Sequence, residues 1–230
     1  FHAAWKRGGL QVTGRMLGVI AGVAVMLSVA ILLADDGSRK PLAYIGSTVA
    51  FWIIGSSLIQ PIQSLRRGLR MPASVVGMTV AHIGVGLFVL GVTLVESASI
   101  ERDVAMKTDV SVQLAGYTYR YTGGEAIEGP NYDGFRGHVT VSRDSRTVAV
   151  LAPEKRRYWV TNSVMTEAGI GAAWNRDVFV ALGEDVGDGA WSLRLQYRPL
   201  IRFIWLGALV MALGGIITLR DERYRRGAQA

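Results

Sequence analysis

Four long apolar runs constrain the fold of this chain more than any other feature of its sequence. They cover Gly14–Ala34, Pro41–Ile59, Pro72–Val95 and Phe203–Leu219. An α-helix rises about 1.5 Å per residue, so about 20 apolar residues cross the hydrocarbon core of a bilayer. Two of the runs reach that length alone, and the other two reach it with their flanks. We therefore expect a polytopic α-helical membrane protein, with three transmembrane helices in residues 1–99 and a fourth in residues 201–230.

The distribution of basic residues predicts which side of the membrane each loop occupies. The chain carries a net charge of +7, yet Ile100–Leu200 holds 12 Lys and Arg against 13 Asp and Glu. The excess lies in three clusters: Lys6, Arg7 and Arg15; Arg66, Arg67 and Arg70; Arg220, Arg223, Arg225 and Arg226. All three fall on one side if each run crosses once, as cytoplasmic loops do. We expect a basic cytoplasmic tail and place residues 100–200 outside the cytoplasm. The clusters carry no interleaved aromatics, so we expect no nucleic-acid partner.

Between Ile100 and Leu200 the apolar residues alternate with polar ones, which is typical of strands. Glycine, proline and Asp-Gly turns separate the alternating segments. The expected strands lie at Ser111–Tyr121, His138–Val141, Thr147–Leu151, Tyr158–Val160, Val178–Leu182 and Trp191–Tyr197, with a helical insertion at Met165–Ala173. Short strands at this density predict a small barrel or sandwich, inserted before the last transmembrane helix.

The chain contains no cysteine. This excludes a thiol nucleophile, a thiolate-bound metal and a redox dithiol within these residues. It also means that the β-rich domain is held together by its own core, by docking on the membrane part, or by both.

His82 is the ionisable residue that the sequence places deepest in the membrane. It lies about 15 Å into the third run, near the bilayer centre, where ionisable side chains usually face a cavity or a partner. Three roles fit it: a structural histidine bonded to another helix, a member of a proton or ion path, or an axial heme ligand. The spans lack the acidic residues that a proton path needs, which shifts weight towards structure or ligation. On the same helix Gly77, Gly84 and Gly91 form a separate stripe suited to close helix contact.

The remaining candidate sites are weaker. Gly14, Gly18 and Gly22 form another small-residue stripe, which we interpret as a helix-packing face. His2 and His138 are interpreted as surface or packed residues. The segment Glu128–Gly137 fits a docking loop or a tight hairpin. The run Pro153–Trp159 puts three cations beside two aromatics. It fits a solvated strand edge by default, or a site for an acidic partner, a carboxylate ligand or lipid headgroups.

Several segments in order resemble the late part of the CcmF family, the heme lyase subunit of bacterial cytochrome c maturation. These are MTVAHIGVGLFVLGV from Met78, ERDVAMKTDVSVQLAGYTYRY from Glu101, GPNYDGFRG from Gly129, PEKRRYWVTNSVMTEAGI from Pro153, RDVFVALGE from Arg176, and WSLRLQYRPLIRFIWLGALVMALGGIITLRDERYRR from Trp191. They cover most of Pro72–Arg226. Residues 1–70 resemble the family mainly in the placement of their spans.

The resemblance implies a function. Members of the family receive heme from the chaperone CcmE and, with CcmH/CcmI-type subunits, attach its vinyl groups to the CXXCH cysteines of apocytochrome c. They also hold a transmembrane b-type heme between two histidines, and His82 matches the second of these. The resemblance further implies the bacterial inner membrane, with residues 100–200 in the periplasm. The family's tryptophan-rich segment and the other ligand are absent from these 230 residues. We therefore expect the C-terminal portion of a lyase, either a fragment or one product of a split gene, incomplete and inactive without the remainder of CcmF. The alternative is a non-catalytic membrane scaffold or a transporter fragment in which His82 is structural.

Overall fold

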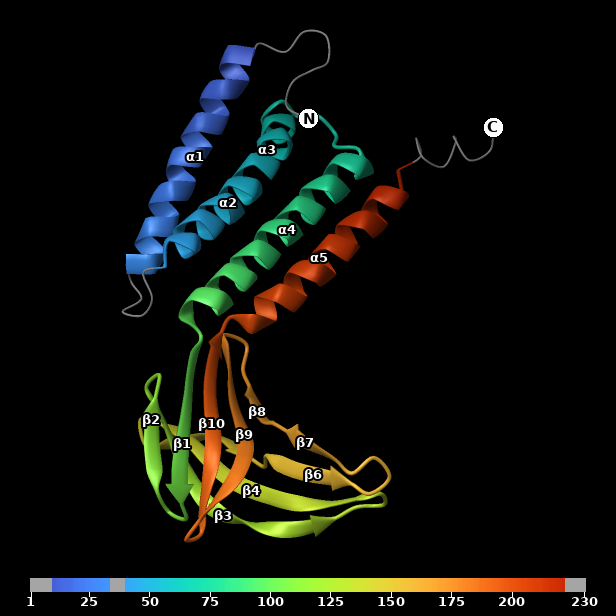
Figure 1. Cartoon of the computed structure of the whole chain (residues 1–230). Helices are drawn as coiled ribbons and strands as arrows, with labels where there is room; N and C mark the ends of the chain where they lie inside the picture. Colours follow the sequence, from blue (N-terminus) through green and yellow to red (C-terminus); the bar gives the residue numbers. More distant parts are fainter. Residues whose placement is uncertain (1–9, 34–39, 222–230) are drawn as a thin grey trace. The chain divides into compact units, whose positions relative to one another are not determined.

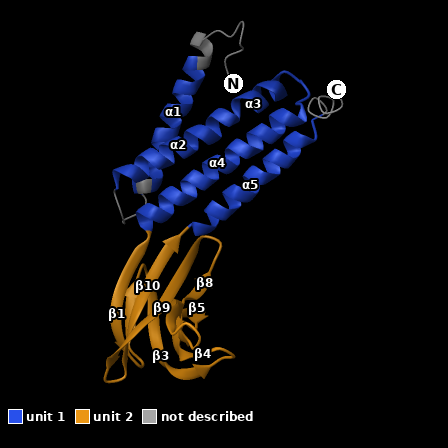
Figure 2. Ribbon diagram, turned by 45° about the vertical axis from the view of Figure 1, so that its right-hand side comes forward, with its two compact units in different colours: residues 1–98, 200–230 blue, residues 99–199 orange. Residues whose placement is uncertain are grey.

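The computed structural model describes residues 10–33 and 40–221, and the chain forms two compact units within it. One unit contains Phe1–Ala98 and Leu200–Ala230, and the other contains Ser99–Pro199. Figure 2 colours the helical unit blue and the β unit orange. The β unit is thus inserted between two parts of the helical unit.

The helical unit places its long helices side by side in the order α1, α2, α4, α5 (Figure 1). The helices are α1 (Leu10–Leu33), α2 (Pro41–Ser57), α3 (Ile59–Arg66), α4 (Ala73–Ala98) and α5 (Ile201–Leu219). Within the described residues, four spans are long and apolar enough to cross a membrane, α2 and α3 together forming one of them. Each predicted span is therefore helical.

The second span breaks at Leu58, and Pro61 explains the break. A proline has no N–H, so the carbonyl four residues earlier loses its helical partner. That carbonyl belongs to Ser57, and the hydroxyl of Thr79 on α4 lies 3.5 Å from it. The same hydroxyl donates a shorter bond of 2.9 Å to Val75 O of its own helix. A buried threonine thus offers the orphaned carbonyl a weak replacement partner.

Glycines bring α4 and α5 into backbone contact. A Cβ added to Gly84 would lie 2.6 Å from Met211 N, and one added to Gly214 would lie 2.4 Å from Ala81 N. A Cβ added to Gly77 or to Gly91 would likewise lie too close to backbone atoms of α5. The close-contact face predicted for the third span is confirmed. The stripe at Gly14, Gly18 and Gly22 differs, because an added Cβ there meets no atom within 4 Å in the described part of the chain.

The β unit consists of two antiparallel sheets (Figure 1). The first has the order β1-β10-β9-β8, and the second has the order β2-β3-β4-β6-β7 with β5 paired to β4. The strands are β1 (Ile100–Lys107), β2 (Ser111–Leu114), β3 (Tyr117–Glu128), β4 (Tyr132–Arg143), β5 (Arg146–Leu151), β6 (Glu154–Tyr158), β7 (Ser163–Glu167), β8 (Gly169–Ala172), β9 (Arg176–Gly187) and β10 (Ala190–Pro199).

The core of the β unit comes from the alternating residues that the sequence analysis used to predict strands. Val178, Val180 and Leu193 of one sheet and Val139 and Val141 of the other are fully buried in one cluster. Phe135 stacks on Trp191 at a centroid distance of 4.4 Å and an interplanar angle of 10°. Side chains from both sheets thus form a common interior, as in a sandwich.

Three predictions for the β unit were wrong. The strand expected at Ser111–Tyr121 is two paired strands, β2 and β3, because Ala115 and Gly116 adopt positive φ and turn the chain between them. Met165–Ala173 is not a helix but contains part of β7 and all of β8. Gly169 and Gly171 disfavour a helix, and an added Cβ at Gly171 would lie 2.7 Å from Val178 Cγ2, so this strand packs too closely for a larger residue. The strand expected at Tyr158–Val160 lies earlier, at Glu154–Tyr158.

Candidate functional site

His82 lies on α4, and its imidazole is exposed at the surface of the helical unit. Nδ1 lies 2.8 Å from the carbonyl oxygen of Met78, one turn earlier on the same helix. In the described residues no hydrogen bond joins His82 to another helix. The ring is therefore anchored by its own backbone rather than by a neighbouring side chain.

This hydrogen bond determines the chemistry of the ring. A carbonyl oxygen only accepts, so the short contact requires Nδ1 to carry the proton. In the neutral imidazole Nε2 then holds the lone pair. A ligating histidine usually donates its other N–H to a carbonyl or carboxylate, which fixes both the tautomer and the ring orientation. His82 thus presents a basic nitrogen outward.

The surroundings of His82 are apolar. Met78, Val85 and Val89 share its side of α4 at helical spacing, and all three are half-buried. This side is distinct from the Gly77, Gly84 stripe that contacts α5.

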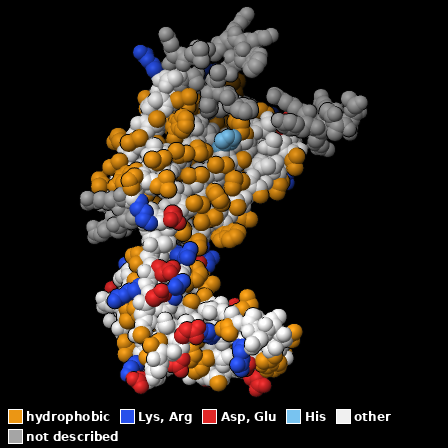
Figure 3. All heavy atoms as spheres, viewed as in Figure 1, with side chains coloured by type: hydrophobic (Ala, Val, Ile, Leu, Met, Phe, Trp, Pro, Cys, Tyr) orange, Lys and Arg blue, Asp and Glu red, His pale blue; other side chains and the backbone are white. Residues whose placement is uncertain are grey.

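Much apolar surface of the helical unit is left uncovered. In each span, only 11% to 33% of the apolar stretch is buried within the chain. Figure 3 shows apolar side chains over most of the visible face of the helical unit. Lipid or further polypeptide must cover such a surface. An imidazole with an unprotonated Nε2 on an apolar surface can coordinate a metal ion that is held in a flat, apolar cofactor.

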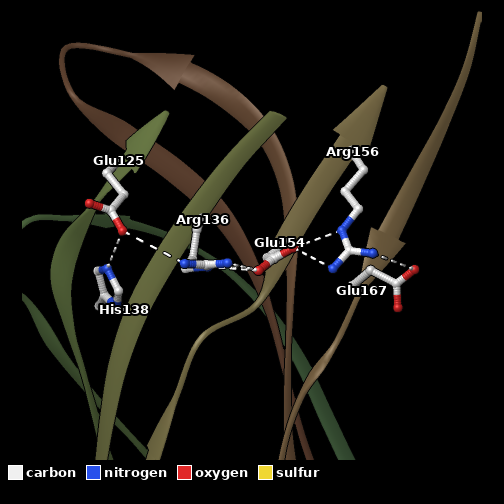
Figure 4. A network of polar contacts seen from close by, with 6 residues as sticks. All are labelled: Glu125, Arg136, His138, Glu154, Arg156 and Glu167. Carbon is white, nitrogen blue, oxygen red and sulfur yellow. Dashed lines mark hydrogen bonds and ion pairs between the residues drawn. The ribbon is translucent and has the colours of Figure 1, made fainter. Parts of the chain in front are cut away.

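A polar network crosses the second sheet of the β unit (Figure 4). Glu154 of β6 is buried, and its carboxylate accepts hydrogen bonds of 2.7 Å from Arg136 Nε of β4 and Arg156 Nε. Burial alone would raise the pKa of Glu154, but the bonds from Arg156 and then Arg136 outweigh it and hold that pKa below its ordinary value. The network therefore stabilises the sheet with its charges paired.

The network corrects the interpretation of Pro153–Trp159 as a solvated strand edge. β6 lies between β4 and β7, so it is an interior strand. Lys155 donates to the carbonyl of Gly183, Arg156 pairs with Glu154, and Arg157 pairs with Asp133 at 2.8 Å. These cations are used within the sheet, and none of them is free for an acidic partner.

The segment Glu128–Gly137 forms a hairpin, one of its two predicted interpretations. Gly129 N donates to Tyr132 O at 2.8 Å, which closes the turn between β3 and β4. Asp133 accepts from Arg157 and from Trp159 Nε1 at 2.9 Å. The pKa of Asp133 lies below its ordinary value because Arg157, and next Trp159, donate to the carboxylate. The aromatic and charged residues here thus connect two hairpins.

His138 lies in β4, where Nε2 is 3.7 Å from Glu125 Oε1. It belongs to the β unit, whereas His82 belongs to the helical unit. His2 lies outside the described residues. The described residues contain no group of three or more His, Asp or Glu that could hold a metal ion. Among the described residues of the helical unit, His82 has no second histidine beside it.

A buried arginine in the β unit was not predicted from the sequence. Arg176 is 7% exposed and donates to Tyr117 Oη at 3.0 Å and to Gly171 O at 2.8 Å. Its guanidinium also lies 4.9 Å from the centre of the Tyr117 ring. Burial would raise the pKa of Tyr117, but hydrogen bonds from Arg176 and Arg143 lower it overall. No local pattern distinguishes Arg176 from a solvated arginine before a strand.

Comparison with known proteins decides the family. Residues 97–199, which include the whole β unit, match the family model described as the CcmF C-terminal beta-sandwich. The chain is 36% identical over 213 residues to the cytochrome c-type biogenesis protein CcmF of Escherichia coli, a match that covers 92% of this chain and 33% of the relative. The chain belongs to the CcmF family.

Other relatives agree with this assignment, and a solved structure has the same fold. CcmF of Pseudomonas fluorescens is 47% identical over 149 residues, covering 65% of this chain and 23% of that protein. CycK of Rhizobium meliloti is 34% identical over 240 residues, covering 99% and 35%. A structure titled Cytochrome c Heme Lyase CcmF superposes with a TM-score of 0.74 at 14% identity, over 95% of this chain and 35% of that one.

Two statements follow from CcmF membership. The predicted fold class, apolar membrane helices with an inserted β domain, is confirmed by the family model and the superposition. The chain spans about a quarter to a third of the length of the curated relatives it matches. Its relatives are named as cytochrome c-type biogenesis proteins, and the chain matches only part of each of them.

Proposed function

We propose that this chain is part of a cytochrome c heme lyase, in which His82 is an axial ligand of a transmembrane b-type heme. The full lyase attaches heme to apocytochrome c, and this chain contributes one ligand and one membrane-spanning surface. The hydrogen bond between His82 Nδ1 and Met78 O carries the proposal, because it leaves Nε2 as the unprotonated nitrogen.

The residues around His82 fit a heme. The imidazole lies on an apolar, exposed side of α4, and half-buried Met78, Val85 and Val89 give it a dry surrounding. Axial ligation and an apolar shell are two means by which a protein tunes the potential of heme iron. When bound, the heme supplies the electron-transfer chemistry, while this chain holds, orients and shields it.

The proposal places the lyase in the bacterial inner membrane. Arg66 ends α3 and Arg67 and Arg70 follow it, while Arg220 follows α5, so basic residues cluster where these spans end. Positive-inside orientation puts these ends and the C-terminus in the cytoplasm, and residues 100–200 in the periplasm.

The β unit acts in this proposal as a structural or docking module. Its polar network is internally paired, and in the described residues no nucleophile–base pair or metal cluster occurs. The partners we propose are the remainder of CcmF, the heme chaperone CcmE, CcmH/CcmI-type subunits and apocytochrome c. The domain limits we propose are residues 1–99, 100–200 and 201–230.

A reduced-minus-oxidised absorbance spectrum tests the heme assignment. The full-length protein, or the complex co-expressed with its partners, is purified as wild type, as His82→Ala and as His138→Ala. We expect b-type bands in the wild type and in His138→Ala, and their loss in His82→Ala. His138→Ala is a matched control, since it removes a histidine outside the helical unit.

The outcome that contradicts the proposal is unchanged heme absorbance in a stably expressed His82→Ala protein. Absence of b-type bands from a well-folded wild type would also contradict it, and would favour a membrane scaffold in which His82 only packs. Deletion of residues 100–199 tests the β unit separately. Retained assembly and maturation activity after that deletion would refute a docking role.

A further inference from the structure

A groove lies between the start of α2 and the end of α4. It has a volume of about 250 Å³ and is lined by Lys40, Leu42, Ile45, Val92, Thr93 and Glu96, with neighbouring small residues. Leu42, Ile45 and Val92 are 69%, 61% and 42% exposed. Since a water takes about 30 Å³ of liquid, the groove has room for a stretch of one alkyl chain.

The two charged side chains of the groove stand at the same level of the helices. Lys40 precedes the first residue of α2, and Glu96 lies two residues before the end of α4. Charged residues at the ends of apolar spans lie at the membrane interface, where lipid headgroups are found. The apolar wall therefore extends from an interface into the hydrocarbon layer.

These two charges are available to a ligand. Lys40 Nζ donates to the backbone carbonyl of Glu96 at 3.1 Å, which uses one of the three donors of the ammonium group. Within the described part of the chain, neither Lys40 nor the Glu96 carboxylate takes part in an ion pair. One cation and one anion thus stand side by side above an apolar groove.

We propose that this groove binds a zwitterionic phospholipid with a primary ammonium headgroup, of the phosphatidylethanolamine type. The phosphate accepts from Lys40, the ammonium group donates to Glu96, and one acyl chain lies along Leu42, Ile45 and Val92. The charges of the headgroup match those of the groove in number and sign. An anionic lipid leaves Glu96 without a partner, and a quaternary ammonium headgroup has no N–H to donate.

A second groove shows what the charges add. It lies between α1 and α2, has a volume of about 230 Å³ and is lined only by apolar residues and glycine, including Val19, Val23 and Phe51. Any acyl chain fills such a surface without selection of a headgroup. The charged rim at Lys40 and Glu96 therefore makes the first groove selective.

Native mass spectrometry of the full-length protein tests the selectivity. Delipidated protein in detergent is titrated with phosphatidylethanolamine, phosphatidylcholine or phosphatidylglycerol of one acyl composition. We expect the first to bind most tightly. Lys40→Glu and Glu96→Lys each weaken its binding by roughly tenfold, because each removes a charge-assisted hydrogen bond. Lys107→Glu on β1 makes the same charge change outside the helical unit and leaves lipid binding unchanged.

Photo-crosslinking identifies the occupant in the whole protein. A benzoylphenylalanine replaces Val92, which lines the groove and is exposed. A crosslink to phospholipid supports the proposal. A crosslink to another segment of the polypeptide overturns it, as does equal affinity for the three lipids or unchanged affinity in both charge-reversal variants. None of these readouts uses heme, so they fail or succeed independently of the heme assignment.

Discussion

The carboxylate of Asp221 accepts a hydrogen bond from the backbone N–H of Ser74 at 2.9 Å, although the two residues are 147 positions apart. Ser74 is the second residue of α4, and Asp221 follows the end of α5. The first N–H groups of a helix have no partner within it, and a carboxylate also interacts favourably with the helix dipole. Asp221 therefore caps the N-terminus of α4 from a distant part of the chain.

Replacement of Asp221 should destabilise the α4–α5 pair. We expect Asp221→Ala to lower the free energy of unfolding by about 1 kcal/mol, the usual effect of losing a capping side chain. Asp221→Asn keeps an acceptor oxygen and should lose less than half as much. Thermal loss of helical circular dichroism in detergent measures both. Equal melting temperatures for the wild type and Asp221→Ala would show that the bond contributes nothing.

A larger residue at Gly84 should separate α4 from α5. An added Cβ there would lie 2.6 Å from Met211 N and 2.8 Å from Gly207 O, and backbone atoms cannot rotate away. We expect Gly84→Leu to cost about 3 kcal/mol of stability, at the upper end of overpacking effects. Gly215→Leu is the matched control on α5, because an added Cβ there meets nothing within 4 Å.

Melting temperatures of the two glycine variants in the same detergent provide the comparison. A Gly84→Leu protein as stable as Gly215→Leu would contradict the packing described for α4 and α5.

Glu154 should make the β unit sensitive to acid. Its pKa lies below the ordinary value of 4.5 in the folded state, so its ionised form stabilises the fold. That contribution is fully present above the unfolded-state pKa and is lost as the pH falls through the lower folded-state pKa. We expect Glu154→Gln to lower the free energy of unfolding by about 2 kcal/mol near neutral pH. Acidification should then lower the stability of this variant little further.

Hydrogen exchange of the β4 and β6 amides in the full protein, at about pH 7 and about pH 3, measures this local stability. Glu101→Gln is a suitable control, because the Glu101 side chain is half-exposed, on the other sheet. Acid-induced loss of protection that is as large in Glu154→Gln as in the wild type would exclude Glu154 as its cause.

His82→Gly offers a test that separates ligation from packing. A small variant leaves space for free imidazole, which has the same basic nitrogen as the lost side chain. We expect b-type absorbance to disappear in His82→Gly and to return in part when imidazole is added to the full-length complex. Restored folding without restored absorbance would assign His82 a packing role.

The sequence alone identified the helices, the insertion and His82. A lipid core requires long apolar runs, so the spans were visible without any knowledge of tertiary contacts. The alternation in residues 191–197 predicted a strand correctly, because one face of that strand is buried in the common core. The alternation in residues 111–121 also indicated strand structure, but it gave no sign of the turn at Ala115 and Gly116 that divides this segment into β2 and β3. His82 stood out because an ionisable residue in an apolar run is rare. The regular spacing of Gly77, Gly84 and Gly91 along one helix predicted their close-contact stripe.

Tertiary structure decided how polar groups are used. The run Glu154–Arg157 looked solvent-exposed, yet partners from β4 and β9 let it form an interior strand. Met165–Ala173 looked partly helical, but the short strands β7 and β8 pair with β6 and β9. The proton on His82 Nδ1 follows from a 2.8 Å contact, and the cap at Ser74 comes from a residue 147 positions away. Local periodicity in the sequence predicts which apolar residues are buried. A buried polar group instead depends on a specific partner, which any distant part of the chain can supply.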